Sequence, residues 1–285
     1  MKPSPALRIV TIVGVALLLL WSLGPIYWTL VSAVTPSADF SARPIHFFPQ
    51  HFTFDHISRL LGINVERIGG VLVWAQFRAA LFNSIATSLA ATVLCVAIAA
   101  IGGYAFTRLD FPGKRVIFLV VIATLAVPGY AVLIPLYRIM IGLKLIDTYL
   151  GITLIYISAY LPLTLWLMRS VFDSLPIALE EAAQLDGAGR LRIFFNIVLP
   201  LVGPGLTAAA ILTFLGAWGQ YLVPLIFSPS ATKPLTVLIP EFVTKNFIDY
   251  GLITASGTIA IIIPALVVIF LNRYLVTGLL AGSVK

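Results

Sequence analysis

Side chains that could catalyse a reaction or hold a metal are few in this sequence, and they do not converge. The three histidines, His46, His51 and His56, have too few acidic neighbours to suggest the ligand set that a metal needs, so they are predicted to be ordinary loop histidines. The single cysteine, Cys95, lies in an apolar stretch and is expected to be a small buried side chain without a disulfide partner. The sequence therefore predicts no metal and no cofactor bound by this chain.

Motifs for ATP hydrolysis and for common hydrolases are absent from the sequence. Gly113-Lys114 is followed by Arg115 and has no glycine five residues earlier, so it is not a phosphate-binding P-loop. The H-E-x-x-H and G-x-S-x-G signatures are missing as well. A membrane enzyme is disfavoured, and any ATP is expected to bind to a different subunit.

One polar segment concentrates acidic, small and glycine residues. Asp173 or Ser174 can cap a helix there, and Pro176 suits its first turn. Glu180 and Glu181 follow early in this helix, where negative charge is favourable to the helix dipole. These signals predict a short helix that begins near Pro176.

The same segment contains signals for the end of this helix and for a second one. Gly187 or Gly189 can end the first helix near Asp186 in a left-handed cap. One apolar stripe of the first helix is expected to contain Ala178, Ala182 and Leu185. One face of the second helix is expected to contain Leu191, Phe194, Phe195 and Val198, with Arg190 and Arg192 towards water and lipid headgroups.

Composition places these helices in a membrane protein. Of the 285 residues, 60% are hydrophobic and 10% are charged, and the mean hydropathy is +1.05. Soluble domains carry about 25% charged residues, so the bilayer is the expected solvent. The net charge of +7 is spread over loops and helix ends, without a patch for nucleic acid. Six stretches reach the roughly 20 apolar residues that a spanning helix needs: 9–33, 81–106, 116–141, 149–168, 201–227 and 252–271.

These spans predict an all-α integral membrane protein with three parts. Residues 1–34 form an N-terminal transmembrane helix whose apolar core is too long for a signal peptide. Residues 35–78 form an extracytoplasmic segment, and residues 79–285 hold five further transmembrane helices with the polar helix at 176–187. Among the short loops, Lys and Arg favour a cytoplasmic N-terminus and C-terminus.

None of the 11 acidic residues lies inside a predicted span. A charge at the bilayer centre costs about 2.5–3.5 kcal/mol on insertion scales, and it is kept there only for a function. Transporters driven by proton or sodium gradients commonly keep such acids. Their absence argues against a secondary transporter or channel, and it indicates that energy comes from a partner.

The polar segment resembles the EAA motif of permeases from binding-protein-dependent ABC importers. Each anchor of that motif is present at its spacing, namely Glu181-Ala182-Ala183, Gly187, Ile197 and Leu199-Pro200. The resemblance covers essentially the whole chain. It implies the type I importer permease fold, in which six transmembrane helices carry a cytoplasmic coupling helix between the fourth and fifth.

In that family the coupling helix docks into a cleft on an ATPase subunit. The resemblance implies that Glu181 contacts the ATPase, that Ala182 and Ala183 permit close docking, and that Gly187 makes the turn. The residues implied in ATPase coupling are Glu180, Glu181, Ala182, Ala183, Leu185, Asp186, Gly187, Ile197, Leu199 and Pro200. The implied partners are a second homologous permease, forming a heterodimer, two ATPase subunits that bind ATP and magnesium, and an extracytoplasmic solute-binding protein, all at the bacterial cytoplasmic (inner) membrane.

Further features are similar to the sugar-uptake, MalG-like branch of this family. Asn83-Ser84 opens the second span, the loop 108–115 joins the second and third spans, and a short tail at 278–285 ends the chain. The implied substrate is a sugar or oligosaccharide.

The fifth span departs from the family pattern. Gly219-Gln220-Tyr221 follows Trp218, where many relatives carry Asn-Asp before an aromatic residue, so substrate contacts are not carried over there. As a hypothesis, Asn83, Trp218, Gln220 and Tyr221 line the substrate pathway, because sugars suit aromatic faces and amide donors. The alternative is ordinary packing and anchoring at the membrane interface.

Overall fold

The computed structural model describes residues 5–41, 44, 46–68, 71–244 and 248–282. Its regular structure is almost wholly helical, as predicted, with one antiparallel pairing of β1 (Arg67–Ile68) with β2 (Val71–Leu72). The chain divides into two compact units, residues 1–80 with 235–262, and residues 81–234 with 263–285. Each unit combines segments that are distant in the sequence but pack together. The predicted division of the chain after residues 34 and 78 follows chain order instead, and it stays a prediction.

The first unit contains the N-terminal helix, the segment that follows it and residues 235–262. Its elements are α1 (Pro5–Ala33), a 3-10 turn (Ser37–Ser41), α2 (Asp55–Leu61), β1, β2, the first residues of α3 (Val73–Arg108), α12 (Leu235–Leu238), a second 3-10 turn (Ile239–Phe242) and the start of α13 (Tyr250–Gly282). His56 lies on α2 and is buried, with its Nε2 atom 3.0 Å from the carbonyl oxygen of Thr35. It therefore packs inside the unit, unlike the loop histidine that was predicted.

A charge network joins distant segments of this unit. The Arg59 guanidinium pairs with the carboxylates of both Glu66 and Asp249. Burial alone would lower the pKa of Arg59, but the hydrogen bonds and charges of these two acids outweigh it and raise the pKa. Arg59 therefore stays charged, and the network ties α2 to the segment before α13.

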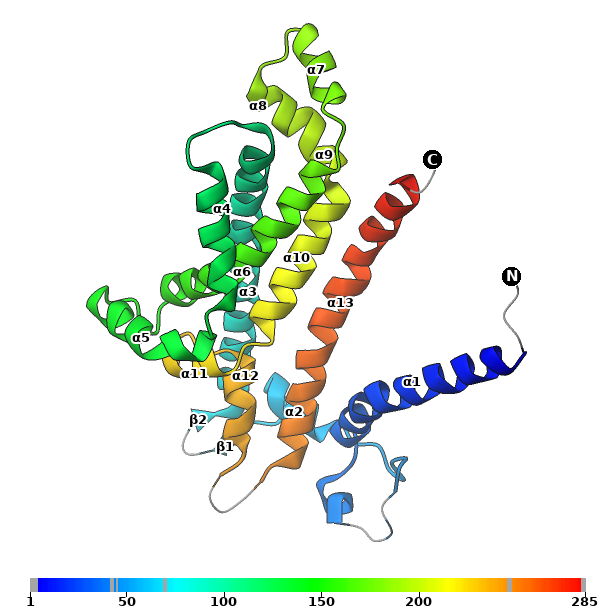
Figure 1. The fold of residues 1–285 in the computed structure, drawn as a ribbon. Coiled ribbons are helices and arrows are strands. Elements are labelled where there is room, and N and C mark those ends of the chain that lie inside the picture. The colour runs from blue at the N-terminus through cyan, green and yellow to red at the C-terminus, as the bar shows by residue number, and fades with distance from the viewer. Residues whose placement is uncertain (1–4, 42–43, 45, 69–70, 245–247, 283–285) are drawn as a thin grey trace. The chain divides into compact units, whose positions relative to one another are not determined.

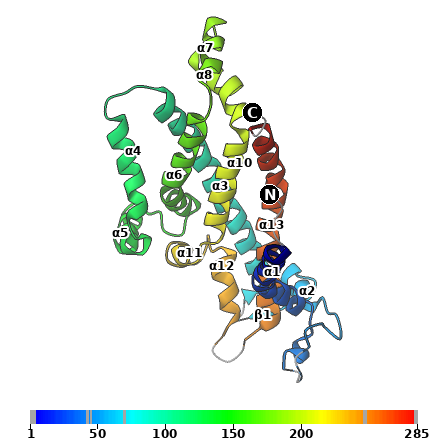
Figure 2. The same cartoon turned by 45° about the vertical axis from the view of Figure 1, so that its right-hand side comes forward.

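The second unit contains most of the predicted spans. Its elements are the rest of α3, α4 (Lys114–Ala123), 3-10 turns (Thr124–Ala126 and Gly129–Val132), α5 (Leu133–Gly142), α6 (Tyr149–Asp173), α7 (Ala178–Leu185), α8 (Arg190–Ile193), a π-helical turn (Phe194–Val198), α9 (Leu199–Leu201), α10 (Gly203–Trp218), α11 (Leu222–Phe227) and the rest of α13. α6 and α10 lie side by side (Figures 1 and 2).

Four helices in the described residues are long and apolar enough to cross a membrane, and six spans result if each bent helix pair counts as one. The third predicted span is such a pair, because Lys114–Ala126 and Gly129–Gly142 are bent by 96° (Figure 2). Pro128 lies in the break. A proline disfavours helical geometry at the residue before it, and Val127 is extended, with φ −77° and ψ 122°. The third span at 116–141 is therefore a bent pair of helices and not one straight helix.

The fifth predicted span, 201–227, is also interrupted. α10 ends at Trp218, and α11 begins only at Leu222. Pro224 lacks the N–H that a continuous helix would need, but it is tolerated in the first turn of α11, where that donor has no partner. On the other side, Arg190–Leu201 meets Gly203–Trp218 at 74°.

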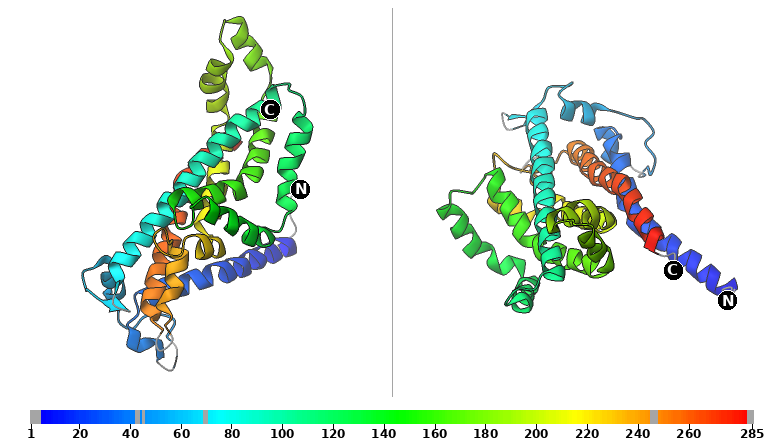
Figure 3. Two further views of the ribbon diagram at one scale, coloured as in Figure 1. Left: turned by 90° about the vertical axis from the view of Figure 1, so that its left-hand side faces the viewer. Right: turned by 90° about the horizontal axis from the view of Figure 1, so that it is seen from above.

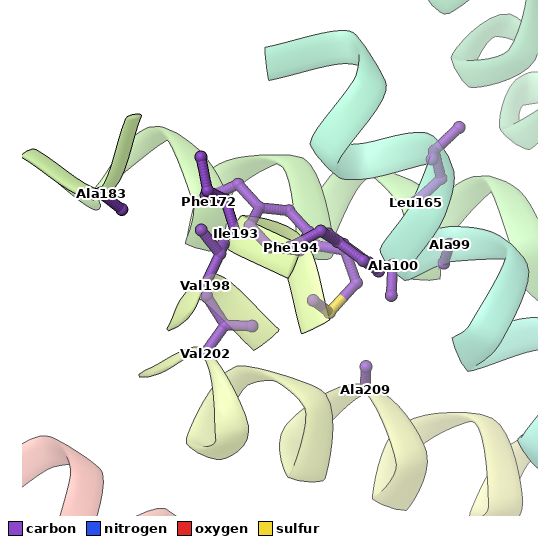
Figure 4. Close-up of a cluster of buried hydrophobic side chains, with 11 residues drawn as sticks. Ala99, Ala100, Leu165, Phe172, Ala183, Ile193, Phe194, Val198, Val202 and Ala209 are labelled. Atoms are coloured by element: carbon purple, nitrogen blue, oxygen red, sulfur yellow. The ribbon is translucent and has the colours of Figure 1, made fainter. Parts of the chain in front are cut away.

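The core of the second unit lies where the polar segment meets the long helices. Figure 4 shows buried side chains from α3, α6, α7, the segment after it and α10 in one cluster. Phe172 and Met168 of α6 are fully buried within it. Small residues of α3, Ala99 and Ala100, allow the close approach of helices that membrane proteins use for packing.

Candidate functional site

The α7–α8 hairpin is the candidate functional site, because it carries the motif and projects beyond the ends of α3, α4 and α6 (Figures 1 and 3). α7 begins at Ala178, two residues later than the predicted start at Pro176. A turn precedes it, in which the N–H of Leu179 donates to the carbonyl of Pro176 at 3.3 Å. The predicted short helix is therefore present with a later first residue.

The predicted cap at the start of α7 is wrong. α6 continues to Asp173, so Asp173 and Ser174 belong to the end of that helix. The Ser174 hydroxyl donates to the carbonyl of Val171 at 2.7 Å, and Asp173 lies 3.6 Å from Arg169. Both side chains thereby interact with α6 and do not cap α7.

The end of α7 has the predicted left-handed glycine. Gly187 has a φ of +81°, a conformation that costs a residue with a Cβ more than it costs glycine. Its N–H donates to the carbonyl of Gln184 at 2.9 Å, and the N–H of Ala188 donates to that of Ala183 at 3.0 Å. This pair of bonds is a Schellman motif, which satisfies the last carbonyls and turns the chain sharply.

The inner face of α7 is fixed by an ion pair. Glu180 is buried, and its Oε1 atom accepts a hydrogen bond from Nε of Arg108 at 2.5 Å. Its Oε2 atom accepts one from the hydroxyl of Tyr104 at 2.8 Å, while Arg108 also donates to the carbonyl of Leu175 at 2.9 Å. Arg108 and Tyr104 were not singled out in the sequence, although their spacing of four places them on one face of the helix end.

The outer face of α7 is exposed and partly apolar. Leu185 is 90% exposed, Leu179 is 45% exposed, and Ala182 and Glu181 are also exposed. Ala183, by contrast, is buried in the core cluster. A projecting apolar face that the described residues leave uncovered is suited to bind another protein.

The second helix differs from the predicted one. Phe194 and Val198 are buried, but Leu191 and Phe195 are exposed, so only half of the expected apolar face packs against the core. A π-helical turn at Phe194–Val198 changes the register of the side chains from Phe194 onwards, whereas Leu191 precedes this turn.

The remaining motif residues lie at the base of the hairpin or at its turn. Ile197 and Leu199 are half-buried against the core cluster, while Pro200 and Asp186 are exposed. Ile197 and Leu199 therefore position the hairpin, and the residues on its outer surface are available to a partner.

The four pathway candidates have different surroundings. Asn83 is buried, and its amide donates to the carbonyls of Ala231 and Lys233 at 3.1 and 2.9 Å. Gln220 donates to the hydroxyl of Tyr160 at 2.6 Å. Asn83 therefore holds the loop that follows α11.

The two aromatic candidates flank that glutamine. Trp218 is buried and stacks on Phe214, with ring centroids 5.6 Å apart, whereas Tyr221 is exposed. A cavity between α6 and α10, beside Thr164 and Thr213, holds only about 100 Å³. Ligand pockets usually span about 300–1,000 Å³, so this cavity is too small to hold a sugar.

The loop after α11 has a second anchor that sequence reasoning missed. Asp147 accepts hydrogen bonds from the backbone N–H groups of Ser230, Ala231 and Thr232 at 3.3, 2.8 and 3.0 Å. Burial would raise the pKa of Asp147, but these donors outweigh it and lower the pKa. An isolated acid in a polar loop has no sequence signal for such a role.

Comparison with known proteins identifies relatives over most of the chain. A family model described as the binding-protein-dependent transport system inner membrane component matches residues 96–280. The osmoprotective compounds uptake permease protein GgtD of Synechocystis sp. is 36% identical over 81% of this chain and 78% of its own length. The trehalose transport system permease protein SugB of Mycobacterium tuberculosis is 34% identical over 96% of this chain and 94% of its own.

The fold is shared with a solved transporter. A crystal structure of a bacterial ABC transporter involved in the import of the acidic polysaccharide alginate matches with a TM-score of 0.78. The match covers 96% of this chain and 98% of that chain at 23% sequence identity. The all-α permease fold expected from the sequence is thereby confirmed.

Proposed function

The chain belongs to the family of binding-protein-dependent transport system inner membrane components, and on that basis we propose that it imports a sugar or oligosaccharide. It is a transport permease and not an enzyme. The name of SugB, which refers to trehalose, and the alginate transporter of the same fold support a carbohydrate substrate. The name of GgtD, which refers to osmoprotective compounds, favours a small compatible solute as the second candidate.

The observation that carries this function is the exposed outer face of α7. The face combines Leu185, which is 90% exposed, with small Ala182 and acidic Glu181 on a helix that projects from the bundle. Full burial of an exposed leucine side chain is favourable by roughly 1.5–3 kcal/mol, so this residue favours a partner that covers it. In the proposed complex an ATPase subunit covers it.

The proposed complex contains this chain with a second homologous permease as a heterodimer, two ATPase subunits and an extracytoplasmic solute-binding protein. ATP and magnesium bind to the ATPases, and this chain binds no cofactor of its own. ATP drives the cycle because it binds the closed ATPase pair more tightly than the open one, and α7 passes that difference to the permease. The complex lies in the bacterial inner membrane.

The proposed substrate pathway includes Trp218, Gln220 and Tyr221, which offer aromatic faces and an amide. The break between α10 and α11 supports this, because non-helical backbone at membrane depth is tolerated where it is buried in protein or lines a water-filled cavity. Asn83 contributes to the pathway through the loop that it holds.

The coupling role is tested by co-purifying this chain with its ATPase subunit and measuring ATP hydrolysis. Glu181→Lys reverses the charge on the exposed face of α7, and we expect at least about a tenfold loss of ATPase binding, a cost common for single interface residues. Failure of the wild-type chain to retain any ATPase subunit would contradict the proposal.

Two glycines of the hairpin give a matched pair for the same assay. Gly187 and Gly189 both have space for a Cβ, but only Gly187 has a positive φ. Gly187→Ala is expected to distort the end of α7 at a cost of about 1 kcal/mol and to weaken ATPase binding about fivefold. Gly189→Ala is expected to bind like the wild type; equal effects of the two changes would mean that the left-handed turn does not matter.

A further inference from the structure

α7 has few contacts that could transmit a force into the permease. Of its eight residues, all of which the structure describes, only Glu180 and Ala183 are buried, and the other six are exposed. Isolated helices of this length are unstable in water, so its orientation depends on these two contacts and on its terminal turns. Ala183 provides a single methyl group in the core cluster.

The contact of Glu180 is directional. Both carboxylate oxygens are used, one by Arg108 and one by Tyr104, and the side chains of Arg108 and Glu180 are only 10% and 7% exposed. Arg108 also reaches the carbonyl of Leu175, in the segment before α7. Charge-assisted bonds in a buried place constrain both angle and distance, which an alanine methyl does not.

The helix that receives this contact is long and unbroken. α3 runs to Arg108 without a proline, and Asn83 lies on it about 38 Å from Arg108 at the rise of an α-helix. At that far end, Asn83 donates to the carbonyls of Ala231 and Lys233. α3 therefore connects the base of α7 to the loop 228–234.

We propose that Arg108, Glu180 and Tyr104 are positioning residues that make α7 move as one body with the adjacent end of α3. A displacement of α7 by the ATPase is thereby passed along α3 to the loop 228–234. The inference rests on the proposed function. It assigns Glu180 to the inside of the permease and leaves the ATPase contact to its neighbour Glu181.

The alternative route is the covalent link from α6 to α7 alone. In that case the ion pair only helps the hairpin to fold, and a well-packed apolar pair would replace it without effect on transmission. Buried ion pairs can often be replaced by apolar residues of similar volume without loss of stability. This property separates the two roles experimentally.

The experiment uses the complete transporter with its ATPase subunits in lipid nanodiscs. Hydrogen–deuterium exchange in the loop 228–234 is measured before and after addition of magnesium, ATP and vanadate. The test variants are Glu180→Gln, Arg108→Lys and the apolar pair Arg108→Met with Glu180→Leu. Asp173→Asn is the matched control. It removes a partly exposed ion pair with Arg169 at the end of α6 that leads into α7.

We expect ATP to change the exchange of this loop in the wild type and in Asp173→Asn. In the test variants the change is expected to fall about threefold or more while the ATPase subunit stays bound. A full response of the apolar pair with bound ATPase would overturn the proposal, whether or not the single variants fold. Absence of ATPase binding in the wild type would instead refute the proposed function.

Discussion

At the scale of single residues, two polar side chains fix the conformation of a loop through hydrogen bonds to its backbone. Asn83 and Asp147 approach the loop 228–234 through opposite chemistry, since the amide donates to its carbonyls and the carboxylate accepts from its N–H groups. Backbone groups outside helices and sheets need other partners, and these two side chains supply them to the loop. The loop is thereby given one conformation.

Replacement of Asp147 by Asn tests the electrostatic part of this anchor. Asn tolerates the positive φ of 58° at this position, so the change removes the charge and spares the backbone. We expect a loss of about 1.5–3 kcal/mol, typical of hydrogen bonds to a charged group, in detergent unfolding at pH 7. Asp110→Asn, at a fully exposed carboxylate, is the control and is expected to change stability by less than about 0.5 kcal/mol.

The pH dependence of this anchor follows from the direction of the shift. Because the pKa of Asp147 is lowered in the folded protein, its stabilisation is present above the ordinary Asp pKa and is lost as the pH falls through the folded pKa. The difference between wild type and Asp147→Asn should therefore stay constant from pH 7 to about pH 5 and shrink below about pH 3.9. A difference that disappears at pH 6 would refute this account.

At the scale of elements, prolines and glycines decide where the helices break and how closely they pack. Pro128 lies in the break of the third span, and Pro224 lies in the first turn of α11, within the predicted fifth span. Gly216 of α10 faces the ring of Tyr160 on α6, where an added Cβ would lie 2.5 Å from a ring carbon. Tyr160 is itself held by Gln220, so the ring cannot move freely.

Gly216→Ala is expected to destabilise the second unit by about 1–3 kcal/mol through overpacking between α6 and α10. Thermal unfolding can be followed by the reaction of buried Cys95 with a thiol-reactive dye. Gly14→Ala in α1 is the control, because nothing lies within 4 Å of its Cβ position and alanine favours the helix. Equal melting of Gly216→Ala and wild type would mean that the two helices separate easily.

At the scale of the whole molecule, the proposal requires α7 to lie on the same side of the membrane as the ATPase. The predicted orientation has a cytoplasmic N-terminus and C-terminus. It rests on the positive-inside rule, since Lys and Arg are favoured in short cytoplasmic loops such as 108–115.

Labelling with a membrane-impermeant maleimide tests this orientation. In a Cys95→Ser background, a cysteine at exposed Gln50 should react in intact spheroplasts, whereas one at exposed Asp110 should react only after permeabilisation. Residue 50 lies in the predicted extracytoplasmic segment, and residue 110 lies in a predicted cytoplasmic loop. Labelling of both from outside, or the reverse pattern, would contradict the orientation.

The amino-acid sequence by itself determined that the chain is a helical membrane protein, and it located the EAA-like motif. Spanning helices of about 20 apolar residues can be recognised in a sequence because the bilayer sets the length and the polarity of each helix. The left-handed turn at Gly187 was also predictable, because it depends on one residue and its neighbours in the chain. The cap predicted at Asp173 or Ser174 failed because it assumed that α6 ends before these residues, whereas α6 continues to Asp173.

Only the tertiary structure decided which residues face each other across the chain. Glu180 is one of two adjacent glutamates, and no local signal predicts that it is buried while Glu181 is exposed. Its burial depends on Arg108, which is 72 residues away and approaches only because α3 and α6 pack together. The motif could therefore be recognised from local sequence. Which of its side chains are buried and which are exposed was decided by packing between distant parts of the chain.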